Sequence, residues 1–293
     1  MRLSHPDRVF WPDVGVTKEG LAAYYAEIAD RVLPHVADRP LSFVRCPDGV
    51  AEKCFFQKHA WAGLDEKLVR RVKVGDDEAL SIRNLDGLLA LVQAGVLEIH
   101  PWGAKVRSPE KPDRITVDLD PGEDVPWPVM QQAAREVRER LRLVGHESFL
   151  KVTGGKGLHV VVPLKARAGW DEVKAFAQGV ASEMARDASD RFTVDMTKAV
   201  RRGRIYVDYL RNGRGATAVA AYSTRARAGA PVSTPLDWEE LDTLTSGAFY
   251  TLANVPARLA HLSTDPWAEM DEAARPLVKV AAHRSRARTS APR

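Results

Sequence analysis

The sequence predicts an α/β (α+β) fold in which helices and strands alternate and the strand order is mixed. Three observations support this. The chain has 293 residues, of which 45% are hydrophobic and 28% charged, a globular composition that is sufficient for one large domain or two small ones. From Ile115 onward, short apolar runs alternate with amphipathic helical patterns. No G-x-G-x-x-G sequence follows a strand and opens a helix, which argues against a dinucleotide-binding fold.

The first part of the chain combines helices with strands and turns. Thr17 is expected to cap a helix over 18–32, which Pro34 ends, and Ser81 or Asn84 to cap another that ends at Gly95. The expected strands and turns are residues 39–58, followed by a strand over 96–100 and a loop over 103–114.

The second part has a clearer βα pattern. The expected strands cover residues 115–119, 149–152, 158–164, 205–210 and 217–222. The expected helices begin near Pro126 and at Trp170, and residues 237–244 are also expected to be helical.

Charge and cysteine content limit the class of protein. The formal net charge is +4, but five basic residues and no acidic residue lie between Val278 and Arg293, so the body of the chain is close to neutral. We expect residues 278–293 to be a disordered basic tail. No apolar run is long enough to span a membrane, and the start of the chain has no signal-peptide core. Cys46 and Cys54 are interpreted as small buried apolar side chains in a protein of the reducing cytoplasm.

Asp118-Leu119-Asp120 is the most informative triplet. Residues i and i+2 of a strand share a face, so both carboxylates point to one side while Val117 and Leu119 enter the core. The repulsion between two such acids disappears when a divalent cation with hard oxygen ligands, such as Mg²⁺ or Mn²⁺, binds between them. The alternative is an exposed strand end that is acidic.

A glycine-rich turn follows the next strand, at Thr153-Gly154-Gly155-Lys156-Gly157-Leu158-His159. Free backbone N–H groups in such a turn form an anion-binding nest, to which Lys156 and His159 add a charge and a donor. The turn lacks the Walker spacing, and an ordinary glycine hairpin is the alternative.

Asp208 lies inside an apolar strand and is the only acidic residue among eight basic residues between Lys198 and Arg227. A buried acid needs a partner, which is either a neighbouring arginine or a metal ion shared with Asp118 and Asp120. His100 could reach the same site or could be a hydrogen-bonded residue at a strand end. Of the exposed-looking pair Phe55 and Phe56, at least one is expected to be in the core because neighbours in a strand face opposite ways. Three acids beside a triphosphate cradle are typical of two-metal nucleotidyl transfer.

These segments resemble the polymerase domain of bacterial ligase D, a branch of the archaeo-eukaryotic primase superfamily. The resemblance rests on Val117-Asp118-Leu119-Asp120-Pro121, on the glycine-rich turn and on Val207-Asp208-Tyr209-Leu210-Arg211-Asn212, in this order. Further stretches are Phe55-Phe56-Gln57-Lys58, Ile99-His100-Pro101-Trp102 and Ser223-Thr224-Arg225-Ala226-Arg227. The similarity covers residues 4–256. It implies a primase-polymerase core with mixed and antiparallel central sheets flanked by helices, in which a palm resembling an RNA-recognition motif carries the acidic triad.

The resemblance also implies roles for individual residues. Asp118, Asp120 and Asp208, with His100 nearby, would bind two Mn²⁺ or Mg²⁺ ions. The residues at the incoming NTP or dNTP would be Thr153, Gly154, Gly155, Lys156, His159, Arg201, Ser223 and Arg225. Those at the DNA would be Arg8, Lys18, Arg45, Phe55, Phe56 and Lys58, of which Arg8 and Lys18 would hold the 5′-phosphate across a gap.

The implied activity is template-dependent addition of nucleotides, with a preference for NTPs, to fill short gaps or extend ends during non-homologous end joining. The alternatives are a primase that starts chains de novo and a DNA-end-binding protein without catalysis. A catalytic domain is expected over residues 1–275, divided into an N-terminal part of about 1–110 and a palm of about 111–260. No lysine-x-Asp-Gly ligase motif follows. A stand-alone or excised polymerase is therefore expected, acting in the cytoplasm with a separate ligase and a Ku-like partner.

Overall fold

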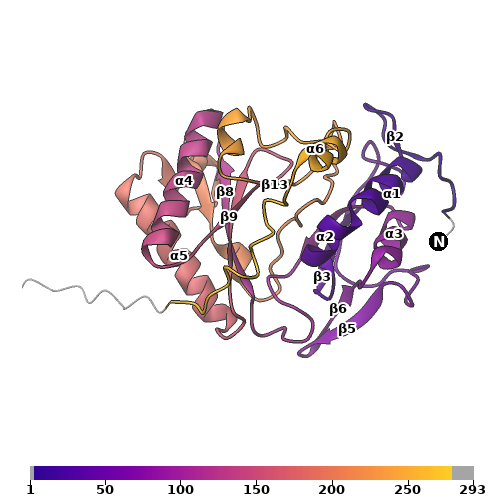
Figure 1. Ribbon diagram of the computed structural model, residues 1–293, viewed down its shortest axis with the longest axis horizontal. Coiled ribbons are helices and arrows are strands. Elements are labelled where there is room, and N and C mark those ends of the chain that lie inside the picture. The colour runs from indigo at the N-terminus through magenta and orange to yellow at the C-terminus, as the bar shows by residue number, and fades with distance from the viewer. Residues whose placement is uncertain (1–2, 279–293) are drawn as a thin grey trace, which may run out of the picture.

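The computed structural model describes residues 3–278, and its two main sheets draw their strands from different parts of the chain (Figure 1). The five-stranded sheet consists of β3 (Leu41–Arg45), β4 (Phe55–Gln57), β5 (Arg70–Val74), β6 (Asp77–Ser81) and β7 (Val96–Pro101). The six-stranded sheet consists of β8 (Arg114–Pro121), β9 (Phe149–Val152), β10 (Leu158–Pro163), β11 (Phe192–Thr193), β12 (Ile205–Asp208) and β13 (Pro235–Leu236). A small ribbon pairs β1 (Val9–Trp11) with β2 (Val16–Thr17).

Helices flank both sheets. They are α1 (Lys18–Glu27), α2 (Ala29–Val36), α3 (Leu85–Gln93), α4 (Trp127–Leu143), α5 (Trp170–Asp187) and α6 (Val255–His261), with short 3₁₀ turns η1 (Lys198–Arg201), η2 (Leu210–Asn212) and η3 (Glu240–Thr243). Figure 1 shows α4 and α5 together beside the six-stranded sheet, and α1 to α3 with the other sheet. The expected mixed α/β class is therefore confirmed.

The six-stranded sheet has the order β11-β12-β8-β10-β9-β13 and is antiparallel except for the β11–β12 pair. In the central strand β8, Val117 and Leu119 belong to the hydrophobic core, while Asp118 between them points to the opposite face. One sheet face therefore packs on the helices, and the other is available for polar side chains.

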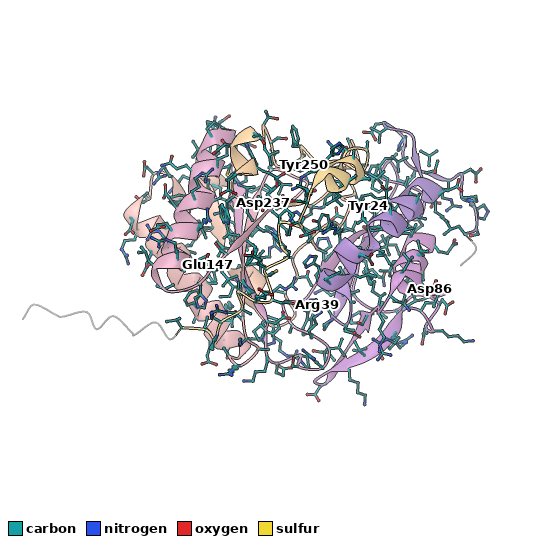
Figure 2. The ribbon with its side chains drawn as sticks, viewed as in Figure 1. Tyr24, Arg39, Asp86, Glu147, Asp237 and Tyr250 are labelled. Atoms are coloured by element: carbon teal, nitrogen blue, oxygen red, sulfur yellow. A yellow bond between two sulfur atoms is a disulfide. The ribbon has the colours of Figure 1, made fainter. Side chains whose placement is uncertain are left out.

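A buried ion pair joins the two sheets. Arg39 immediately precedes Pro40 and β3, Asp113 immediately precedes β8, and the guanidinium donates to both carboxylate oxygens at 2.7 Å. Arg39 is only 2% exposed and lies between the two halves of the molecule in Figure 2. Removing one partner of such a pair would leave an uncompensated buried charge.

Several expected elements differ in the structure. Thr17 caps α1 as predicted, but the helix breaks at Ile28, and Pro34 lies inside α2 rather than after it. Residues 217–222 form no strand. Ala220 N donates to Ile99 O, but the segment then ends in Tyr222, whose φ is +64°. A left-handed backbone at a bulky residue breaks regular pairing.

The cysteine interpretation is wrong, because Cys46 and Cys54 form a disulfide. The cause is hairpin register. Arg45 pairs with Phe55 across β3 and β4, so the next two residues outward face each other. Cys46 is buried and Cys54 is exposed. The cysteines therefore give no support to a reducing compartment.

None of the helices within residues 3–278 is long and apolar enough to cross a membrane. The expectation of a disordered tail falls on residues 278–293, of which 279–293 lie outside the described residues.

Candidate active site

Three acidic residues from distant parts of the chain share one face of the six-stranded sheet. Asp118 and Asp120 lie on β8, and Asp208 lies on β12, directly opposite Asp118 in the antiparallel register. His159 on β10 faces Asp118 from the other side. The strand register therefore brings together the three carboxylates that the sequence analysis grouped.

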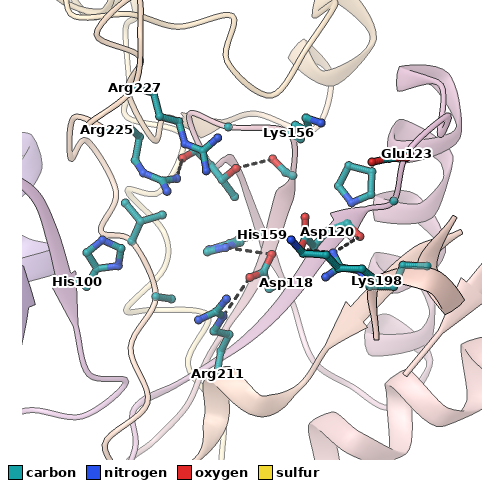
Figure 3. A pocket seen from close by; sticks show the side chains of 18 of the residues that line it. His100, Asp118, Asp120, Glu123, Lys156, His159, Lys198, Arg211, Arg225 and Arg227 are labelled. Carbon is teal, nitrogen blue, oxygen red and sulfur yellow. Dashed lines mark hydrogen bonds and ion pairs between the residues drawn. The ribbon is translucent and has the colours of Figure 1, made fainter. Parts of the chain in front are cut away.

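Arginines compensate these acids. Arg211 Nε lies 3.1 Å from Asp118 Oδ2 and 3.1 Å from Asp208 Oδ2, and Arg201 contacts the Asp120 carboxylate. Figure 3 shows Arg211 and His159 both directed at Asp118. Asp118, Asp120 and Asp208 thus form an acidic floor, which attracts cations.

The two facing acids differ in proton affinity. Burial favours the neutral form of Asp118, but His159 and Arg211 outweigh it and lower the pKa of that carboxyl. Burial raises the pKa of Asp208. The Arg211 charge opposes this effect and the nearby Asp118 charge adds to it, so the pKa of Asp208 remains raised. Burial, together with the charge of Lys151, lowers the pKa of His159 to about 4, which keeps the imidazole neutral near pH 7.

The glycine-rich turn lies beside the acids and is closely packed. A Cβ on Gly157 would lie 2.5 Å from Leu119 O, so a glycine is required there. Thr153 Oγ1 donates to Gly157 O at 3.0 Å and closes the turn. The N–H groups of Gly155 and Lys156 donate to no acceptor within residues 3–278, as an anion nest requires.

A cavity of about 830 Å³ opens between Asp118 and Asp120 on one side and this turn on the other (Figure 3). Asp208 lies beside Asp118 on the next strand but does not itself line the cavity. Its wall includes Asp118, Asp120, Glu123, His100 and His159, and also seven basic side chains: Lys156, Lys198, Arg201, Arg202, Arg211, Arg225 and Arg227. Seven basic residues against Asp118, Asp120 and Glu123 leave the wall with an excess of four positive charges. Such a wall suits a polyanion, for example a triphosphate, beside the carboxylates.

His100 and Arg225 reach the cavity from the far side and share a buried partner. Glu98 Oε2 lies 2.8 Å from His100 Nε2 and 3.0 Å from Arg225 Nε, while Glu98 Oε1 accepts from Ala226 N at 2.9 Å. Burial would raise the pKa of Glu98, but the His100 and Arg225 contacts lower it to about 2.

The two phenylalanines of β4 are both on the surface, at 42% and 54% exposure for Phe55 and Phe56. The expectation that one of them is in the core is therefore wrong. β4 is the edge strand of its sheet, and both of its phenylalanine side chains are exposed to solvent there. Phe56 packs edge-on against His100 at 5.9 Å between ring centroids, and the Lys58 ammonium lies 5.8 Å from the Phe56 ring.

The remaining expected DNA-binding residues lie outside the cavity. Arg8 donates to Asp48 Oδ1 and Pro47 O, both at 2.9 Å. Lys18 is 3% exposed and donates to Ser4 O, and burial and the Arg8 charge lower its pKa. Arg45 donates to Ala94 O and stacks over Trp61.

The structure does not bring Ser223 to the cavity. It is fully buried, and its hydroxyl accepts from Ile99 N and donates to Thr224 O. In contrast, Thr153, Gly155, Lys156, Arg201 and Arg225 all line the wall, and Gly154 belongs to the same turn.

Sequence reasoning missed several residues of the wall. It expected the basic run around Asp208 to hold phosphates, but it gave no individual role to Lys198, Arg202, Arg211 or Arg227. It also missed Glu98, whose signal was available, because a carboxylate two residues before a histidine in a strand shares its face.

The donor set fits divalent cations. Carboxylate oxygens are the ligands that Mg²⁺ and Mn²⁺ prefer, and guanidinium groups now compensate their charge. With the side chains so arranged, no three acids, histidines or cysteines of the described chain are positioned to hold an ion together. Metal binding would therefore require Arg201 and Arg211 to turn away from the acids.

The fold and this cavity define a primase-polymerase, a class of metal-dependent nucleotidyltransferases. The family model described as "LigD, primase-polymerase domain" matches residues 17–267. The chain belongs to this family.

Curated relatives and a solved structure support the same family assignment. The chain is 43% identical over 273 residues to a multifunctional non-homologous end joining protein LigD of Pseudomonas aeruginosa, covering 92% of this chain and 32% of that protein. It is 29% identical over 254 residues to a bifunctional LigD of Bacillus subtilis, covering 86% of this chain and 41% of that protein. The chain thus spans about a third of the first of these relatives. The polymerase domain of Mycobacterium tuberculosis ligase D, solved in complex with DNA, matches with a TM-score of 0.84 and 29% identity, covering 94% of this chain and 99% of that one.

Proposed function

We propose that this protein adds nucleotides to a DNA primer end under the direction of a template, filling short gaps or extending ends in non-homologous end joining. The observation that carries the proposal is the set of three carboxylates on adjacent strands beside a glycine-rich turn and a basic wall. Relatives named as non-homologous end joining proteins support the same pathway.

The protein's own residues bind and orient the nucleotide. Free N–H groups of Gly155 and Lys156 would bind the triphosphate, with Arg201, His159 and Arg225 directed at its oxygens. Preorganised donors of this kind stabilise the charge that develops on the leaving pyrophosphate. The substrate is an NTP or dNTP, and we propose a preference for NTPs.

Asp118, Asp120 and Asp208, with His100 nearby, would hold two Mn²⁺ or Mg²⁺ ions. When bound, such ions lower the pKa of the attacking 3′-hydroxyl and neutralise charge on the pyrophosphate. Arg211, once displaced from Asp118 and Asp208, would be free to bind phosphate oxygens.

The DNA would lie along β4 and the N-terminal segment. Phe55 and Phe56 offer exposed rings for base stacking, and Lys58 and Arg45 lie on the same hairpin. Arg8 and Lys18 would hold the 5′-phosphate of the downstream strand. Their present partners, Asp48 and Ser4 O, would have to yield to the phosphate.

The experiment is primer extension on a short gap, with and without a 5′-phosphate, comparing NTPs with dNTPs. Asp118→Ala and Asp208→Ala should abolish addition while DNA binding persists, and Asp242→Ala, which removes an exposed ion pair with Arg135, is the control. Extension by either Asp variant of the acidic triad at the wild-type rate would refute the proposal. Synthesis without any primer would instead indicate a de novo primase, and DNA binding without addition would indicate an end-binding protein.

Completing a repair reaction requires further activities. Sealing the filled gap needs a DNA ligase activity, and we propose a Ku-like protein as the partner that holds the ends. Both would act with this chain in the cytoplasm, at the nucleoid.

A further inference from the structure

Glu98 is a buried acid of β7 that belongs to neither the acidic floor nor the expected site residues. It is 5% exposed, and it pairs with Val44 in the β3–β7 register. A carboxylate removed from water is costly unless several donors satisfy it. The identity of those donors therefore indicates what the residue does.

Two of its three partners, His100 and Arg225, line the cavity. Glu98 Oε2 contacts His100 Nε2 at 2.8 Å and Arg225 Nε at 3.0 Å, and Oε1 accepts from Ala226 N at 2.9 Å. Arg225 in turn donates to Thr153 O, in the glycine-rich turn. One carboxylate thus connects strand β7, the segment that carries Arg225, and the turn that faces the nucleotide.

The contact with His100 also fixes which ring nitrogen is free. Because Nε2 is engaged with the Glu98 carboxylate, Nδ1 is the nitrogen without that contact. Outer carboxylates that orient a histidine in this way are a common device in sites that bind cations.

The rest of the 220–226 segment is held to β7 without Glu98. Ala220 N donates to Ile99 O at 2.9 Å, Ile99 N donates to Ser223 Oγ at 2.9 Å, and Thr224 Oγ1 donates to Leu97 O at 2.6 Å. These three bonds would keep the segment in place if Glu98 lost its charge. The negative charge of Glu98 therefore acts mainly on the side chains of His100 and Arg225, not on the backbone of this segment.

We propose that Glu98 is a positioning residue for nucleotide addition, which aims Arg225 and His100 into the cavity and through them sets the affinity for the incoming nucleotide. The inference rests on the proposed function, because it takes the cavity as the nucleotide site. Glu98 itself touches neither the acids nor the turn.

The test uses Glu98→Gln, which preserves shape and the acceptor for Ala226 N but removes the charge. Binding of ATP with Mn²⁺ is measured by calorimetry without DNA, and extension kinetics are measured separately on a gapped duplex. The dissociation constant and the nucleotide KM should rise, and kcat/KM should fall, by about ten- to hundredfold. Glu136→Gln, which breaks the ion pair with Arg191 away from the cavity, is the matched control and should leave both unchanged.

A double-mutant cycle separates positioning from folding. If Glu98 acts through Arg225, then Glu98→Gln should weaken ATP binding much less in an Arg225→Ala background than in the wild type. Equal loss in both backgrounds would overturn the inference, as would wild-type ATP affinity in Glu98→Gln.

Failure of the inference and of the proposed function are distinguishable. Wild-type extension together with unaltered ATP binding and kinetics in Glu98→Gln would overturn the inference alone. A wild-type protein that binds ATP but extends no primer would overturn the proposed polymerase, and the cycle on ATP binding would still decide the role of Glu98. A wild-type protein that binds no ATP would overturn both.

Discussion

The Arg211 guanidinium balances the negative charges of Asp118 and Asp208. The Arg211→Gln variant tests whether the guanidinium occupies the place that a bound metal ion would take. At about 3 Å and an effective dielectric constant of about 20, each gross attraction is about 5 kcal/mol. Arg211 is partly exposed, at 44% of its side chain, so solvent screening reduces the net effect. We expect a net loss of about 2 kcal/mol, typical of hydrogen bonds to charged groups.

In EDTA, that loss should lower the melting temperature by about 4–8 °C. Added Mn²⁺ should then stabilise the variant more than the wild type. The ion need not displace a guanidinium in the variant, and about 2 kcal/mol corresponds to about thirtyfold in affinity. At a hundredfold excess over its dissociation constant, Mn²⁺ contributes about 2.7 kcal/mol.

The assay is thermal unfolding across a Mn²⁺ titration, which requires no activity. The melting curves of variant and wild type should converge as Mn²⁺ increases, and Asp118→Asn should respond to Mn²⁺ in neither background. An equal Mn²⁺ shift in wild type and Arg211→Gln would refute the idea that guanidinium and metal compete for the same acids.

Four further variants test the fold. Gly157→Ala should abolish nucleotide addition and destabilise the fold by about 1–3 kcal/mol in urea unfolding, because its Cβ would lie 2.5 Å from a backbone oxygen. Gly179→Ala in α5, where no atom lies within 4 Å of the added Cβ, should instead stabilise the fold by about 0.5–1 kcal/mol. Arg39→Met should destabilise the fold by about 3–5 kcal/mol by the same measurement, because Asp113 loses its bidentate partner and keeps only a 3.6 Å contact with Arg114. Burial lowers the pKa of His35 well below its usual value, so the unfolded chain binds more protons as pH falls below about 6.5, and stability should fall from pH 7 to pH 5 less steeply in His35→Phe.

Each of these has a contrary result. Equal effects of the two glycine substitutions would show that the turn can expand. Wild-type stability of Arg39→Met would show that the buried pair contributes little. An unchanged pH slope in His35→Phe would assign the acid sensitivity to other groups.

The part of the site that could be predicted from sequence lies on regular strands. The alternation in β8 placed Asp118 and Asp120 on one face without knowledge of any neighbour, because strand geometry is local. Glu98 followed the same rule relative to His100, but its importance depends on Arg225, more than a hundred residues away. Partners of that kind are set by tertiary packing.

The errors have the same origin. The disulfide follows from the register of β3 against β4, and this register cannot be predicted from the number of cysteines. The break at Ile28 and the left-handed Tyr222 depend on what packs beside them, and no local pattern marks either one. The burial of Ser223 likewise depends on the neighbouring β7.

The negative and positive charges of the cavity have different structural supports. Asp118, Asp120 and Asp208 lie on strands of one sheet, whereas each lysine and arginine of the described cavity wall comes from a turn, a 3₁₀ segment or a connecting loop. Loops accept substitution and small movements more readily than central strands. Substitutions in single loops can therefore change the affinity for substrate phosphates during evolution, while the positions of the three carboxylates stay constant.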